Sequence, residues 1–208
     1  MKTITFEELV DPEKYQLIDQ IDHRDLAEKI RGYLSRPSLV NRVYLAANLL
    51  ALALAAFGWY RANATFIQAF LPLGLGIAAG YLVLVPLHEA LHALVYRLYG
   101  AKTVTVQYRW RQLAATCMVD RFVTDGRQTA WAALVPFLVI NPLLALLAAL
   151  NTPASLLLCG ALVLHVGACS GDFGILNLVW EHRSRGFYMV DDLSRQQTYF
   201  YTPCDREK

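Results

Sequence analysis

Hydrophobic residues in this chain gather into long runs instead of alternating with polar ones. Three stretches contain no Asp, Glu, Lys or Arg: 43–60, 62–87 and 128–171. A charge-free run of about 18 or more residues is long enough to cross the hydrocarbon core of a bilayer. None of the three shows the polar stripe of a soluble amphipathic helix. The pattern predicts four membrane-spanning helices, at about 43–60, 66–96, 130–150 and 155–180.

Residues 1–42 are charged, mixed in sign and without the short apolar core of a signal peptide. The pair Asp11-Pro12 is typical of a helix start, and apolar residues follow it at helical spacing. A second helix is expected to begin near 22–25 and to end near Pro37, which cannot continue it. This N-terminal arm is therefore predicted to be helical and to form a cap outside the membrane.

The segment between the second and third predicted spans is polar. Within it, residues 104–110 alternate between apolar and polar types, and this period of two predicts a strand. Residues 114–119 are its expected partner in a small β-hairpin. Such a hairpin can be a plain surface element, or its edge can receive an extended peptide by strand addition. The sequence leaves both interpretations open.

Lysine and arginine lie almost wholly on one side of the predicted spans. Of the 19 basic residues, all except Arg61 fall in the arm, in the polar segment 97–128 or in the C-terminal tail. Cytoplasmic segments of membrane proteins carry this excess of positive charge. Both termini and the polar segment are therefore predicted to be cytoplasmic.

Composition supports the membrane assignment, with a hydrophobic fraction of 56% and a charged fraction of 17%. Soluble domains have about 45–50% and 25% respectively. The four cysteines form no CxxC pair and are interpreted as small buried hydrophobic residues. The predicted fold class is an all-α polytopic membrane protein with one small hairpin. Its three parts are a cytoplasmic arm at 1–42, a membrane-embedded domain at 43–180 and a cytoplasmic tail at 181–208.

Ionisable side chains are rare inside the predicted spans and costly there, so each one suggests function. His88-Glu89-Ala90-Leu91-His92 forms an HExxH motif in otherwise apolar sequence. Two histidines four residues apart share one helix face and can ligate a single Zn²⁺. Glu89 is placed to reach a water at the metal, as a catalytic base would. The alternative is a His/Glu cluster that only packs and hydrogen-bonds.

A catalytic zinc needs a third protein ligand and an open position for water. Asp172 is the other acidic residue inside the spans. Counted back from the cytoplasmic ends of their helices, Asp172, His88 and His92 lie at a similar depth. Asp172 is therefore the predicted third ligand. The alternative is a hydrogen bond from its carboxylate to Asn141 or Asn177.

His165 is predicted on nearly the same helix face as Asp172 but about 10 Å further outward. It can be a ligand, a hydrogen-bond partner of a ligand or a buried core histidine, and the last two fit its depth better. His165 and Asn141 are therefore candidates for residues that hydrogen-bond to the metal ligands without binding the metal.

Several of these segments resemble a family of small prokaryotic membrane proteins of unknown function that are described as zincin peptidases. The resemblance covers about half of the chain, and its HExxH part is the specific one. The matching segments are PLHEALHA at 86–93, LYGAK at 98–102, LVP at 134–136 and CSGD at 169–172. More distantly, the arrangement is similar to site-2 protease-type intramembrane metalloproteases. Those enzymes place HExxH in one helix and an aspartate in a later one.

The resemblance implies that His88, His92 and Asp172 bind Zn²⁺ and that Glu89 is the catalytic base. It also implies the cytoplasmic membrane of a prokaryote as the location. This chain has SGDF at 170–173, where site-2 proteases usually have Asn-Pro-Asp-Gly. The departure concerns the third ligand more than the first two.

The leading functional hypothesis is a zinc-dependent intramembrane metallopeptidase with a membrane-associated or membrane-spanning peptide as substrate. A second class is a non-enzymatic metal-binding membrane protein, either a transporter or a sensor. A third is an inactive scaffold that binds membrane partners. The expected partners are the lipid bilayer and a protein or peptide substrate, with no nucleic acid. The sequence sets neither the substrate's identity nor the oligomeric state.

Overall fold

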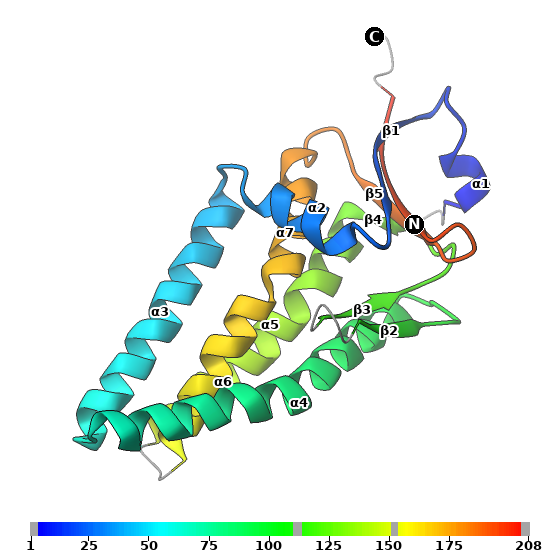
Figure 1. Cartoon of the computed structure of the whole chain (residues 1–208). Coiled ribbons are helices and arrows are strands. Elements are labelled where there is room, and N and C mark those ends of the chain that lie inside the picture. Colours follow the sequence, from blue (N-terminus) through cyan, green and yellow to red (C-terminus); the bar gives the residue numbers. More distant parts are fainter. Residues whose placement is uncertain (1–3, 110–113, 151–153, 205–208) are drawn as a thin grey trace.

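Four long helical spans dominate the computed structural model, which describes residues 4–109, 114–150 and 154–204 (Figure 1). All four are long and apolar enough to cross a membrane, as the hydrophobic pattern predicts. Their ends lie within a few residues of the predicted bounds. The helices are α3 (Leu39–Ala62), α4 (Phe66–Leu98), α5 (Gly126–Ala149), and α6 (Ser155–Ala168) with α7 (Ser170–Glu181).

The fourth span is not one continuous helix. α6 ends at Ala168 and α7 begins at Ser170, with a break at Cys169 between them. The hydrophobic pattern predicts a single helix here because no proline marks the interruption. The break places Asp172 in the first turn of α7 instead of in the middle of a helix.

α4 and α6 cross in direct backbone contact. A Cβ atom added to Gly76 of α4 would lie 1.9 Å from the carbonyl oxygen of Leu157. One added to Gly160 of α6 would lie 2.1 Å from the carbonyl oxygen of Leu73. Side chains larger than glycine would therefore force the two helices apart. This close approach brings the HExxH end of α4 near the break between α6 and α7.

A four-stranded antiparallel sheet covers one end of the helices (Figure 1). Its strand order is β1-β6-β5-β4, so the N-terminal arm and the C-terminal tail pair with each other. The prediction of an all-α fold is wrong in this respect. The strands are β1 (Tyr15–Asp22), β4 (Thr124–Asp125), β5 (Tyr188–Asp192) and β6 (Gln197–Pro203).

The helix predicted to begin at Asp11-Pro12 is also wrong, because β1 occupies its place. A β-bulge between Leu17 and Asp19 interrupts the alternation of this strand. An extra residue at a bulge changes a spacing of two into a spacing of three, which imitates a helix. Pairing with β6 in the distant tail then selects the strand, and Ile21 is buried in the core beneath the sheet.

Two other local predictions are confirmed. The second helix of the arm is α2 (Leu26–Leu34), which follows the short α1 (Phe6–Leu9). The hairpin between the second and third spans pairs β2 (Thr105–Arg109) with β3 (Ala114–Met118). Trp110, predicted in the first strand of this hairpin, lies outside the described residues. α2 packs on α7, where a Cβ atom on Gly174 would lie 2.3 Å from the carbonyl oxygen of Ile30.

Candidate metal centre

Two histidines and a glutamate are buried near the end of α4 that lies closest to the sheet. The exposed fractions of His88, Glu89 and His92 are 9%, 6% and 8%. The two imidazole rings lie one helical turn apart, and their Nε2 atoms are separated by 2.9 Å. The spacing of four residues therefore does place both rings on one face of the helix.

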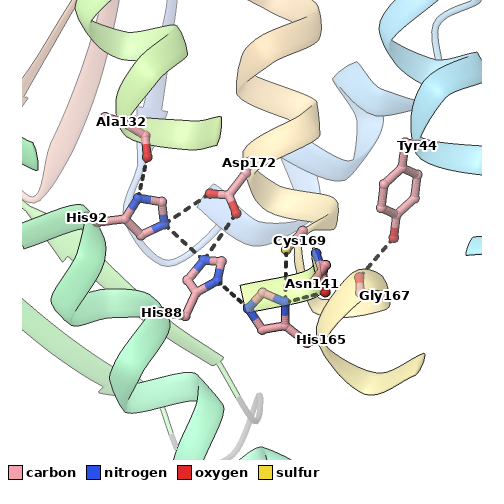
Figure 2. A network of polar contacts seen from close by, with 9 residues as sticks. All are labelled: Tyr44, His88, His92, Ala132, Asn141, His165, Gly167, Cys169 and Asp172. Carbon is pink, nitrogen blue, oxygen red and sulfur yellow. Dashed lines mark hydrogen bonds and ion pairs between the residues drawn. The ribbon is translucent and has the colours of Figure 1, made fainter. Parts of the chain in front are cut away.

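Asp172 joins this pair from the first turn of α7 (Figure 2). Its Oδ2 lies 3.1 Å from His88 Nε2, and its Oδ1 lies 3.2 Å from His92 Nε2. The structure thus brings together the three residues that the sequence predicts as ligands. Asn177, the alternative partner for the Asp172 carboxylate, instead donates to two carbonyl groups of the N-terminal arm.

The chemical character of this group fits zinc. One donor atom from each of His88, His92 and Asp172 lies within 4.8 Å of the other two. Two imidazole nitrogens and one carboxylate oxygen form a donor set that holds catalytic zinc and leaves a fourth position open. A second group, His88 with His165 and Cys169, also lies within 4.8 Å and shares His88 with the first.

His165 contacts the opposite edge of the His88 ring. Its Nε2 lies 3.1 Å from His88 Nδ1, and its Nδ1 lies 2.8 Å from Asn141 Oδ1. Because the amide oxygen of Asn141 can only accept, the proton of His165 is on Nδ1. His165 Nε2 then accepts from His88 Nδ1–H, so His88 Nε2 keeps its lone pair for a metal. His165 and Asn141 therefore lie where supporting residues would.

Two contacts at this site escape prediction from the sequence. His92 Nδ1 lies 2.8 Å from the main-chain oxygen of Ala132 in α5, and the alanine side chain gives no sign of this role. Cys169 Sγ lies 3.9 Å from His165 Nδ1. Cysteine is a residue type that can bind metals, but without a CxxC partner the sequence does not distinguish Cys169 from a small buried hydrophobic residue.

Glu89 lies beside the ligand group and belongs to neither metal-binding set. Its carboxylate lies close to the backbone of Cys117 in β3. Among the described residues, Glu89 Oε2 has no hydrogen-bond partner. That oxygen is therefore available to a molecule in the site. Burial raises the pKa of the Cys117 thiol to about 12, so this side chain stays protonated in the metal-free protein.

A cavity of about 340 Å³ opens onto the metal group. Its walls come from α2, from the sheet strands β5 and β6, and from β3. The four successive β3 residues 115–118 all line it. Because neighbouring side chains of a strand point to opposite faces, this lining means that an edge of β3 faces the cavity.

Asp191 forms part of the cavity wall on the side of the sheet. Thr198 Oγ1 donates to its Oδ1 at 2.6 Å, and the Val119 amide donates to its Oδ2 at 3.3 Å. Burial raises the pKa of this carboxyl group. Its two hydrogen bonds join β6 to the segment that follows β3 and so hold the cavity wall together.

Comparison with known proteins gives one match. Residues 81–186, about half of the chain, match the sequence model of a family described as "Putative zincin peptidase". The matched region extends from α4 past the end of α7 and includes the HExxH motif, the hairpin and Asp172. No curated protein and no solved structure gives a significant match.

Proposed function

The chain belongs to the family described as "Putative zincin peptidase", and from this membership we propose that it is a zinc-dependent intramembrane metallopeptidase. The observation that carries the proposal is the meeting of His88, His92 and Asp172 beside the partly unpaired carboxylate of Glu89. All four residues lie in helices that are long and apolar enough to cross a membrane. Unpaired ionisable groups are costly in such helices and are retained where they have a function.

His88, His92 and Asp172 would hold the zinc ion. The Nδ1 atom of each histidine is engaged in a hydrogen bond, so Nε2 is the nitrogen that each ring would offer to the metal, and both Nε2 atoms face Asp172. When bound, zinc supplies an activated water with a pKa of about 7 and polarises the scissile carbonyl group.

Glu89 is the proposed general base. Its Oε2 takes a proton from the attacking water and then gives that proton to the amide nitrogen as the carbon–nitrogen bond breaks. The products are a carboxylate and an amine, and the Glu89 carboxylate is restored. Burial keeps bulk water away from Oε2.

The proposed substrate is an extended segment of a membrane-associated or membrane-spanning peptide. Since an edge of β3 faces the cavity, a peptide in β-conformation can lie along it, whereas a helical segment has no free backbone groups to pair. The cavity wall opposite is contributed partly by apolar residues of α2, namely Leu26 and Ile30. A substrate helix would have to unwind before it reaches Glu89.

The proposal is tested by removing the metal. Purified protein in detergent is expected to cleave a model transmembrane peptide, to lose this cleavage after treatment with a membrane-permeant zinc chelator, and to regain it when Zn²⁺ is restored. Cleavage products are measured by mass spectrometry. Cleavage that survives complete loss of zinc, established by elemental analysis of the same sample, would contradict a zinc-dependent mechanism.

The proposed orientation has both termini and the β2–β3 hairpin in the cytoplasm, because almost all basic residues lie on that side. Arg61 and Lys102 are exposed at opposite ends of α4 and report the two sides. In intact cells, an impermeant maleimide is expected to label Arg61→Cys but not Lys102→Cys, and to label both after permeabilisation. Replacing Cys117 and Cys204 with serine lowers the background. Labelling of Lys102→Cys from outside would reverse the orientation.

A further inference from the structure

The orientation of His92 depends on a backbone group of another helix. Its Nδ1 lies 2.8 Å from the carbonyl oxygen of Ala132 in α5. A carbonyl oxygen can only accept, so Nδ1 carries a proton and Nε2 is the nitrogen that remains for a metal. Nε2 is the atom that faces His88 and Asp172.

A carbonyl group in the middle of an α-helix is normally occupied. It accepts a hydrogen bond from the backbone N–H four residues further on, which for Ala132 is position 136. Position 136 is a proline, which has no N–H. The proline ring also crowds the carbonyl group of the residue four positions before it and tilts that group away from the helix. Pro136 therefore both frees the Ala132 oxygen and turns it outward.

We propose that Pro136 is a positioning residue of the metal centre, which opens α5 so that the Ala132 carbonyl fixes the tautomer and the ring orientation of His92. The inference rests on the proposed function in taking zinc as the ion that His92 binds. Pro136 is buried in α5, and Ala132 is almost fully buried. Water is therefore excluded from the His92–Ala132 contact, and the hydrogen bond is not exchanged for one to solvent.

Replacing Pro136 should affect helix stability and zinc binding in opposite directions. A proline inside a helix is far less favourable than alanine, so Pro136→Ala should strengthen α5 itself. The restored N–H at position 136 would draw the Ala132 carbonyl back into the helix and weaken its bond to His92. Loss of an outer hydrogen-bond partner of a ligand typically lowers metal affinity about 10–100-fold. The expected result is a protein that is at least as resistant to unfolding and yet binds zinc about 10–100-fold more weakly.

Two further variants separate this effect from general damage. Pro136→Val restores the N–H but keeps most of the side-chain volume, and it is expected to weaken zinc binding as Pro136→Ala does. Pro72→Ala makes the same chemical change near the start of α4, away from the site, and is expected to leave zinc affinity unchanged. Zinc affinity is measured by competition with a chromogenic chelator, and stability of the metal-free protein by thermal unfolding.

A second measurement does not depend on zinc. In metal-free protein, at a pH high enough to keep the His92 imidazole neutral, its ¹⁵N chemical shifts are expected to show protonation on Nδ1 in the wild type and a mixture of tautomers in Pro136→Ala. Wild-type zinc affinity together with an unchanged His92 tautomer in both Pro136 variants would overturn the inference. Zinc binding that depends on Pro136 without any peptide cleavage would instead contradict the proposed peptidase and leave the inference standing.

Discussion

Glu89→Gln is expected to abolish peptide hydrolysis while the protein keeps its zinc and its fold. Glutamine has the same size as glutamate and keeps a side-chain oxygen that accepts hydrogen bonds. It cannot take a proton from water at neutral pH. Loss of a general base costs about 10²–10⁴ in rate, so cleavage should fall by at least that factor.

The measurement pairs zinc stoichiometry with cleavage of a model transmembrane peptide. Glu28→Gln is the matched control, since it makes the same change on the exposed first turn of α2 and should behave as wild type. A transporter or sensor would respond to Glu89→Gln with altered metal affinity or flux, and a scaffold would not respond. Undiminished cleavage with glutamine at this position would rule out the proposed base.

Asp172→Ala is expected to lose most of the bound zinc. Loss of a supporting hydrogen bond lowers metal affinity about 10–100-fold, and loss of this ligand should lower it further. The carboxylate contacts the Nε2 atoms of both histidines, so its removal leaves two ligands where a catalytic site needs three. His88→Ala and His92→Ala should each have the same effect. His165→Ala, which removes only the partner of His88 Nδ1, should retain zinc at reduced affinity.

Two overlapping groups of donors make this comparison decisive. The alternative set combines His88 with His165 and Cys169. Zinc per chain is measured by elemental analysis of purified variants, with Cys169→Ser added to the series. The proposed ligands require Asp172→Ala to be the more severe change. Full occupancy in Asp172→Ala, together with loss of zinc in His165→Ala and Cys169→Ser, would assign the ion to the other set.

The spans and the chemistry of the site follow from local sequence. Charge-free runs longer than a bilayer's hydrocarbon core have few alternatives to a spanning helix, so all four were predictable. His88 and His92 share a face because the helical repeat puts them there. The approach of Asp172 to these histidines was predictable for a related reason. Few acidic residues lie inside the spans, and the depth of each could be counted from the helix ends. The β2–β3 hairpin was equally predictable, because no bulge interrupts the alternation of apolar and polar residues in its strands.

Contacts between distant segments decided the features that the local sequence pattern does not predict or predicts wrongly. The strand Tyr15–Asp22 exists because the tail supplies β6 as its partner, and its bulge disguises the period of two. The break at Cys169 involves no proline, so the hydrophobic pattern does not show it.

The hydrogen bond between His92 and Ala132 joins a side chain to a backbone oxygen forty positions away. Pro136 is visible in the sequence as a helix-interior proline, but the sequence does not say which side chain will use the carbonyl it frees. Composition and helical periodicity act within one segment and therefore determine the spans and the residue types of the site. Which segments pair, and which atoms face each other, depends on packing between segments far apart in the chain, and one sequence read alone does not contain that geometry.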